Sequence, residues 1–212
     1  EQSVDHSFSR RTDCAILGLM SIFKFKQFEV NQANSAMKIG TDAMIFGSLI
    51  ETFDKNSGLD IGTGTGVLSL MVAQNNPIIQ IKAVEIDENA YLEAEMNFKN
   101  SSFNKQIEAI HCDIQAFLSS QKFDLIFTNP PYFENSSKSI SSQRNLARHT
   151  DTLSLKELAL KVDSLITEDG DFWIILPIEQ MEVIGTHLQD LKFFINQEMV
   201  IFGKENQAVR QV

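Results

Sequence analysis

Cysteine is scarce in this chain of 212 residues, which contains only Cys14 and Cys112. The two lie far apart, and no cluster of cysteine and histidine has the spacing of a metal site. This usage argues against zinc and predicts no bound metal. Isolated cysteines are typical of proteins kept in a reducing compartment, so we expect a cytoplasmic location.

Long hydrophobic runs are also lacking. The nearest approach is Cys14–Phe23, which follows two arginines and mimics the start of a secretory signal. No small-residue cleavage site follows it, two lysines end it, and it is too short to cross a bilayer. We interpret residues 1–24 as an N-terminal extension that is partly non-native, with Met20 as the natural start, and expect no membrane association.

Positive charge is in deficit, because 18 lysines and arginines stand against 28 aspartates and glutamates, giving a net charge of −10. Nucleic-acid binding needs a basic face, so this balance disfavours it over most of the surface. Basic residues cluster near the N-terminus and again at Arg144, Arg148 and His149, as either phosphate contacts or a solvated surface. With 43% hydrophobic residues, no repeat and no linker, residues 25–212 are predicted to form one domain.

The most specific feature that the chain does contain is the tetrad Asn129-Pro130-Pro131-Tyr132, which follows an apolar strand. Proline restricts φ and lacks an N–H, so two prolines hold a rigid bend. In this bend the Asn129 side-chain oxygen and the Pro130 carbonyl can accept both hydrogens of one –NH2 group. Tyr132, with Phe133 beside it, offers a flat face for stacking. The tetrad predicts catalysis at an amide or amine nitrogen; the alternative is a rigid loop without chemistry.

A glycine-rich turn between a predicted strand and a predicted helix reads Asp60-Ile-Gly62-Thr-Gly64-Thr-Gly66. Glycines permit positive φ and close approach of the backbone, so a nucleotide-like cofactor can lie at the start of the helix. Glu85 ends the next strand, 19 residues past Gly66. That is about the spacing of an acid that binds both hydroxyls of a ribose.

The spacing of the turn separates two kinds of cofactor. A dinucleotide would want Gly-x-Gly-x-x-Gly, and Asp60 at the mouth of the loop would repel its pyrophosphate. S-adenosylmethionine carries a sulfonium and an amino group, fits Asp60 better, and is the predicted cofactor. Asp113, at the end of a third strand, is predicted either to accept from the adenine amine of the cofactor or to cap a following helix.

Strands and helices alternate along the chain, which predicts an α/β fold with a doubly wound, Rossmann-like, largely parallel sheet and helices on both faces. The predicted strands are Gly58–Ile61, Ile81–Ile86, Ile107–Cys112, Asp124–Thr128, Phe172–Leu176 and Phe193–Phe202. The predicted helices are Thr41–Phe53, Gly66–Gln74, Glu88–Lys99, Ile114–Ser119, Leu153–Ile166 and Ile178–Leu191. Because ligands bind at the carboxyl ends of such strands, the turn, Glu85, Asp113 and Asn129 should meet at one edge.

With these elements the chain resembles the class I S-adenosylmethionine-dependent methyltransferases from about Phe25 onward. More closely, it resembles the bacterial tRNA(Val) adenine-N6 methyltransferase family, which modifies adenine-37 beside the anticodon. The cofactor loop and the tetrad are shared with many relatives. The more specific part of the resemblance lies in Phe25–Phe28, Ala36–Asp42 and Gln143–Arg148.

The resemblance implies transfer of a methyl group from S-adenosylmethionine to the N6 amine of an adenine in tRNA. It also implies that Lys38, Gly40 and Thr41 border the methionine end of the cofactor, and that Arg144 and Arg148 contact the RNA. The family normally continues to a final antiparallel strand beside the last predicted strand. Since the sequence stops at residue 212, we expect that strand to be missing.

Two alternatives remain open on sequence alone. One keeps the chemistry and changes the substrate, to a glutamine amide of release factors (N5) or a guanine of ribosomal RNA (N2). Such enzymes usually carry a recognition domain before the catalytic one, and the residues before Phe25 leave no room for it. The other is a non-catalytic RNA factor that binds S-adenosylmethionine, which the intact tetrad disfavours. The oligomeric state is left open, with a monomer expected.

Overall fold

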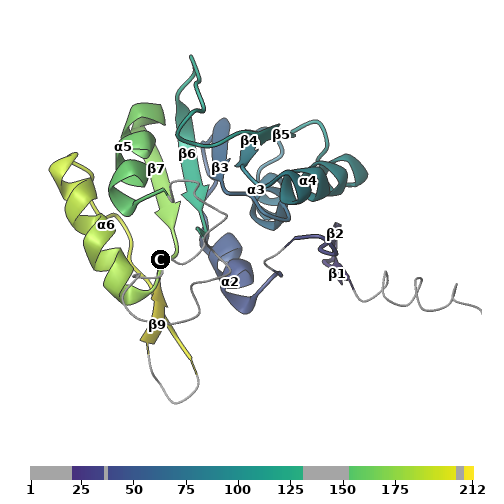
Figure 1. Cartoon of the computed structure of the whole chain (residues 1–212), viewed down its shortest axis with the longest axis horizontal. Coiled ribbons are helices and arrows are strands. Elements are labelled where there is room, and N and C mark those ends of the chain that lie inside the picture. The colour runs from purple at the N-terminus through teal and green to yellow at the C-terminus, as the bar shows by residue number, and fades with distance from the viewer. Residues whose placement is uncertain (1–20, 36–37, 131–152, 204–207) are drawn as a thin grey trace, which may run out of the picture.

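A parallel sheet forms the centre of the computed structural model, which describes residues 21–35, 38–130, 153–203 and 208–212 (Figure 1). Five strands lie side by side in the order β5-β4-β3-β6-β7, and all neighbours are parallel. They are β3 (Ser57–Ile61), β4 (Gln80–Glu85), β5 (Ile107–His111), β6 (Phe123–Thr128) and β7 (Ile166–Ile174). The chain runs outward from β3 to β5 and returns to the other side of β3. The switch point, where such sheets bind ligands, therefore lies between β3 and β6.

Helices cover both faces of this sheet, which confirms the predicted doubly wound fold. On one face α2 (Thr41–Leu49), α3 (Val67–Asn75) and α4 (Glu88–Asn100) share a buried cluster with β4 and β6. On the other face α5 (Leu155–Leu165) and α6 (Ile178–Asp190) pack against β3 and β6. β3 is buried at all five positions, as expected for a parallel strand covered on two sides. None of the described helices is long and apolar enough to cross a membrane.

Two small antiparallel sheets flank the central one. At the N-terminal end β1 (Ile22–Lys24) pairs with β2 (Glu29–Asn31), so the predicted domain boundary at residue 25 falls inside a hairpin. At the C-terminal end β8 (Val200–Phe202) pairs with β9 (Ala208–Gln211). The expectation that a C-terminal antiparallel strand is missing is therefore wrong, because β9 fills that place.

The predicted helix Ile114–Ser119 is also wrong, because these residues form a turn followed by irregular chain. Asp113 caps this turn: its Oδ1 accepts from Gln115 N–H at 2.9 Å, and its carbonyl accepts from Ala116 N–H at 3.0 Å. A segment of six residues gains too few helical hydrogen bonds to offset the cost of starting a helix. The capping role predicted for Asp113 therefore falls on a turn and not on a helix, and its role beside the adenine of the cofactor stays a prediction.

The strand predicted at Phe172–Leu176 runs instead over Ile166–Ile174, and two other predicted elements are shorter by four or more residues. The helix that starts at Thr41 ends at Leu49 instead of Phe53: Ile50 is already extended, with ψ of 116°, and Asn76 Nδ2 donates to the Thr52 carbonyl at 2.8 Å. The predicted strand Phe193–Phe202 keeps only its last three residues, which are those that pair with β9. Both segments are apolar enough to suggest an element, but tertiary partners decide how far it extends.

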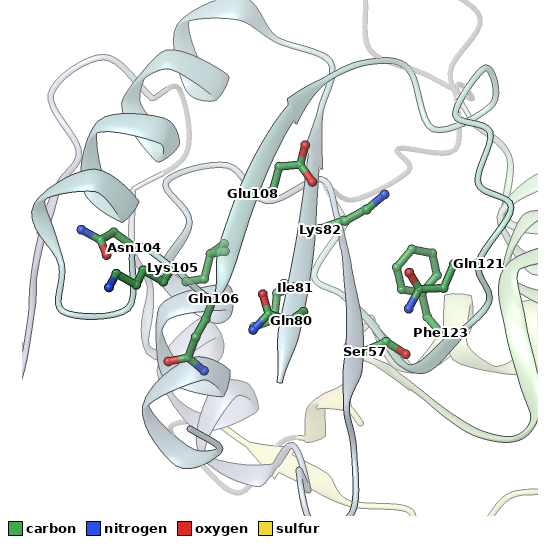
Figure 2. Close-up of a pocket in the computed structure, with 11 residues that line it drawn as sticks. Ser57, Gln80, Ile81, Lys82, Asn104, Lys105, Gln106, Glu108, Gln121 and Phe123 are labelled. Atoms are coloured by element: carbon green, nitrogen blue, oxygen red, sulfur yellow. The ribbon is translucent and has the colours of Figure 1, made fainter. Parts of the chain in front are cut away.

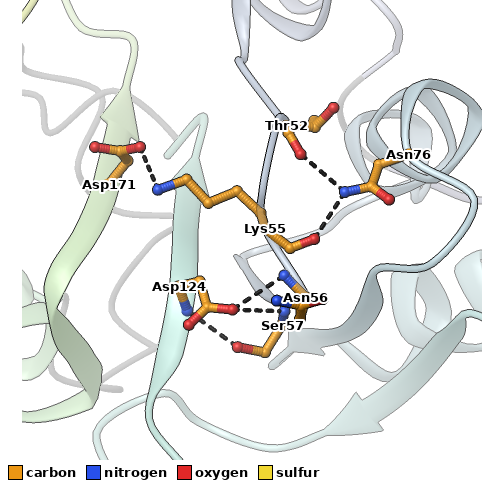
Figure 3. Close-up of polar contacts among 7 residues, drawn as sticks. All are labelled: Thr52, Lys55, Asn56, Ser57, Asn76, Asp124 and Asp171. Carbon is orange, nitrogen blue, oxygen red and sulfur yellow. Dashed lines mark hydrogen bonds and ion pairs between the residues drawn. The ribbon is translucent and has the colours of Figure 1, made fainter.

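The amino edge of the sheet is fixed by the segment that precedes β3 (Figure 3). The Asp124 carboxylate accepts the N–H groups of Asn56 and Ser57 at 3.0 and 3.2 Å, and Ser57 Oγ accepts the Asp124 N–H at 3.0 Å. Lys55 pairs with Asp171 of β7 at 2.5 Å. These contacts join β3, β6 and β7 at one end and so fix how their carboxyl ends line up at the other.

An open depression of about 310 Å³ lies at the same amino edge, over the start of β4 and β5 (Figure 2). Its lining is mostly polar and includes Gln80, Lys82 and Gln106. The glycine turn and Asn129 follow the opposite ends of their strands. The depression is therefore separate from the site that the sequence predicts.

Candidate active site

The glycine turn leaves β3 at the carboxyl edge and enters α3 within a few residues. Gly62, Gly64 and Gly66 all have positive φ, at 72°, 56° and 81°. Gly62 N–H and Thr63 N–H both donate to the Val84 carbonyl, at 2.9 and 3.1 Å, so the turn is held against the end of β4. A Cβ added at Gly62 or Gly64 would meet no atom of the described residues within 4 Å. The backbone there borders open space, as a bound cofactor requires.

Glu85 ties the turn to the end of β4. Its Oε2 accepts the Gly64 N–H at 2.8 Å, and its Oε1 accepts the N–H groups of Ile86 and Asp87 at 2.9 and 3.0 Å. A carboxylate offers about four acceptor positions, so roughly one remains, on Oε2. The arrangement accommodates one further hydroxyl donor; a second ribose hydroxyl would have to displace a backbone donor.

Asp60 lies fully buried beneath the same turn. Its Oδ2 accepts from Thr63 Oγ1 and Ser69 Oγ, both at 2.7 Å, whereas its Oδ1 is buried with no hydrogen-bond partner among the residues that the structure describes. Burial raises the pKa of Asp60 from 3.8 to about 6, the two hydroxyls oppose this increase, and the charge of Glu85 adds to it. A donor or a cation reaching Oδ1 would compensate for the missing partner.

This raised pKa predicts how Asp60 affects stability. The native state holds the Asp60 proton more tightly than the unfolded chain, so its stabilising contribution is full below about pH 4 and is lost as the pH rises through 6. As the pH rises from 4.5 to 7.5, the free energy of unfolding of the wild type should therefore fall by about 2–3 kcal/mol relative to that of Asp60→Asn, which has no carboxylate at this position. Urea unfolding at several pH values would measure this. Parallel profiles for the two proteins would contradict it.

Asn129 and Pro130 follow β6 directly, where Ile61 of β3 pairs with Thr128. Thr128 Oγ1 donates to the Ile61 carbonyl at 2.7 Å and joins the two strands next to the switch point. Pro130 is buried and Asn129 half-buried. The structure thus places the start of the tetrad beside the glycine turn, as the sequence predicted. The other predicted residues of this region lie outside the described residues: Pro131, Tyr132, Phe133, Arg144 and Arg148.

The segment before α2 carries three further predicted residues. Gly40 is the N-cap of α2 and Thr41 its first residue. Lys38 is exposed, and its ammonium group donates to the backbone carbonyls of Gln32 and Ala33. This places Lys38 where it holds its own segment together. Its predicted role beside the cofactor stays a prediction.

Sequence reasoning missed two polar residues of α4 that hold this region in place. Glu93, 4% exposed, accepts the N–H groups of Asn34 and Ser35 at 2.9 and 2.8 Å, and also the Ser35 hydroxyl. Asn97, 3% exposed, donates to the carbonyls of both Asn31 and Thr65, at 2.8 and 2.9 Å. The available signal was a pair of polar residues four apart on the buried side of an amphipathic helix.

Comparisons with known proteins show the family to which the chain belongs. The model of the methyltransferase small domain matches residues 33–176. A tRNA1(Val) (adenine(37)-N6)-methyltransferase of Pedobacter heparinus is 41% identical over 166 residues, 78% of this chain and 71% of the relative. The chain belongs to the tRNA1(Val) (adenine(37)-N6)-methyltransferase family. A relative with the same name from Pseudoalteromonas translucida is 40% identical over 190 residues, 90% of this chain and 82% of the relative.

Solved structures support the fold of this methyltransferase family member. A ribosomal protein L11 methylase from Lactobacillus delbrueckii is 20% identical with a TM-score of 0.57, covering 86% of this chain and 81% of that chain. A predicted O-methyltransferase from Agrobacterium tumefaciens is 16% identical with a TM-score of 0.60, covering 81% and 78%. At these identities the likeness concerns the fold alone.

Proposed function

We propose that this protein transfers a methyl group from S-adenosylmethionine to the N6 amine of adenine-37 in valine tRNA. The observation that supports this most is the placement of Asn129 and Pro130 next to the glycine turn, across the pair that Ile61 makes with Thr128. The residues proposed to bind the amine and the turn proposed to bind the cofactor therefore lie at the same carboxyl edge of the sheet. The names of the relatives supply the substrate.

The residues around the glycine turn fit the proposed cofactor. The unpartnered Asp60 Oδ1 suits an amino or sulfonium group, the open space over Gly62 and Gly64 admits a nucleoside, and Glu85 has an acceptor position left for a ribose hydroxyl. Ile86, 55% exposed beside Glu85, offers an apolar face for a base. When bound, S-adenosylmethionine supplies a methyl group activated by the positive charge on its sulfur.

In this proposal the tetrad binds and orients the reacting amine. The lone pair of adenine N6 is delocalised into the ring, so the amine is a poor nucleophile until it becomes pyramidal. Asn129 Oδ1 and the Pro130 carbonyl would accept its two hydrogens and stabilise the positive charge that builds on N6. The methylated nitrogen then releases a proton to water without a general base. Most of the rate comes from positioning the amine in line with the methyl group.

Methylation of defined transcripts tests the proposal. Incubated with enzyme and S-adenosylmethionine, unmodified valine tRNA should acquire one N6-methyladenine. A matched transcript with guanine at position 37 should acquire none, because the tetrad would find no N6 amine at that position. Mass spectrometry of the digested nucleosides reads both results. Methylation of both transcripts, or of neither, would contradict the assignment of adenine-37.

The two alternatives are separated in the same experiment. A release factor and ribosomal RNA are offered as substrates in parallel reactions. Methylation of either, with valine tRNA untouched, would assign the chain to the glutamine-amide or guanine-N2 enzymes. Binding of S-adenosylmethionine with no methylation of any substrate would favour the non-catalytic RNA factor.

A further inference from the structure

The N-terminal hairpin and the segment after it are basic in an acidic protein. Residues 21–40 carry three lysines, Lys24, Lys26 and Lys38, against one carboxylate, Glu29, whereas the whole chain has a net charge of −10. All three lysines are exposed. Lys24 pairs with Glu29 at 2.9 Å, but no carboxylate among the described residues forms an ion pair with Lys26. Positive charge is therefore available to a ligand at the hairpin tip.

The tip is held rigidly by aromatic side chains. Phe25 N–H donates to the Phe28 carbonyl at 2.9 Å, which closes a loop of two residues, Lys26 and Gln27. The rings of Phe25 and Phe28 stack with centroids 4.4 Å apart. The rings of Phe28 and Phe103 pack in a T-shaped arrangement with centroids 6.1 Å apart. Because the aromatic rings face the protein, Lys26 and Gln27 remain exposed. A preorganised cation loses less conformational freedom when it binds an anion.

Hydrogen bonds also connect the hairpin to the glycine turn, the proposed cofactor-binding loop. Asn97 exchanges two hydrogen bonds with the Asn31 backbone, both at 2.8 Å, and the same side-chain amide donates to the Thr65 carbonyl of the glycine turn. Glu93 holds Asn34 and Ser35, which follow β2, on the same helix. The end of β2 therefore has a fixed position beside the glycine turn, and the hairpin lies next to α4 at the flank of the sheet (Figure 1).

From this arrangement we infer that the hairpin tip, with Lys26 at its centre, binds the phosphate backbone of the RNA substrate. The inference rests on the proposed function, because it supplies the partner. An RNA that places one base in the site must extend past this edge, and phosphates beside that base need cations that an acidic protein rarely offers. The hairpin offers them, and its tie through Asn97 keeps them in register with the cofactor loop.

Lys26→Ala tests this inference. It should weaken tRNA binding about fivefold, the effect of losing one exposed ion pair, and reduce the slope of log affinity against log salt by about 0.7–0.9. The KM for tRNA should rise while kcat at saturating tRNA and the affinity for S-adenosylmethionine stay unchanged. Lys26→Arg should keep the tRNA affinity and the salt slope close to those of the wild type, because it retains the positive charge. Fluorescence anisotropy with labelled tRNA measures binding independently of methylation.

Lys122→Ala is the matched control, because Lys122 is exposed and precedes β6 at the opposite edge of the sheet. It removes the same charge and should leave tRNA affinity close to that of the wild type. Equal effects of the two variants, or no effect of Lys26→Ala on affinity and slope, would overturn the inference while wild-type methylation leaves the proposed function standing. If the wild type neither binds nor methylates tRNA, the proposed function itself fails.

Discussion

Asn129→Ala should lower the rate of methyl transfer by about two to three orders of magnitude and leave cofactor affinity nearly unchanged. That is the typical loss when one preorganised polar contact to a transition state is removed. Asn129 directly follows β6, whose end is fixed to β3 by the Thr128 hydroxyl, so its backbone is well placed before any substrate arrives. Single-turnover methylation at saturating cofactor gives the rate, and calorimetry gives the cofactor affinity.

Asn104→Ala provides the control for this experiment. Asn104 lines the depression at the amino edge, away from the candidate site, and its removal should leave turnover unchanged. Wild-type turnover in Asn129→Ala would remove Asn129 from the mechanism. Loss of cofactor binding together with turnover would instead make it a cofactor-binding residue.

Gly66→Ala should destabilise the fold by about 2–5 kcal/mol. Its φ of +81° costs an L-residue about 1–2 kcal/mol, and an added Cβ would lie 2.3 Å from Cε1 of Phe98. Phe98 is 3% exposed in the cluster between α4 and the sheet, so it has little room to move, and overpacking of this kind costs about 1–3 kcal/mol more. Urea unfolding of the protein without cofactor measures the loss.

Gly64→Ala separates the two causes. Gly64 has a similar φ of +56°, but a Cβ there meets no described residue within 4 Å, so only the backbone cost of about 1–2 kcal/mol should appear. A difference between the two variants therefore measures the contact with Phe98. Equal destabilisation would show that the Phe98 ring yields to the new methyl group at no cost.

Much of the fold followed from local pattern. β3, β4 and β6 were predicted to within one residue at each end, because apolar runs of this length, bounded by glycine or polar residues, have few other solutions. The helix predicted at Ile114–Ser119 was wrong because Ile114 and Phe117 reach the buried cluster from a turn, and burial alone does not distinguish a turn from a short helix. The last strand was predicted too long, because only the residues that pair with β9 form a strand.

The sequence by itself determined the order of the elements, the glycine turn, the tetrad and the family, because each depends on residues close together in the chain. Only the tertiary structure decided that Glu93 of α4 holds the segment after β2, and that Asn97 ties β2 to the glycine turn. Asn97 and Asn31 are separated by 66 positions, so their hydrogen bonds exist only after α4 has packed on the sheet. Likewise, burial raises the pKa of Asp60 and leaves its Oδ1 without a hydrogen-bond partner among the described residues, and no local pattern specifies burial.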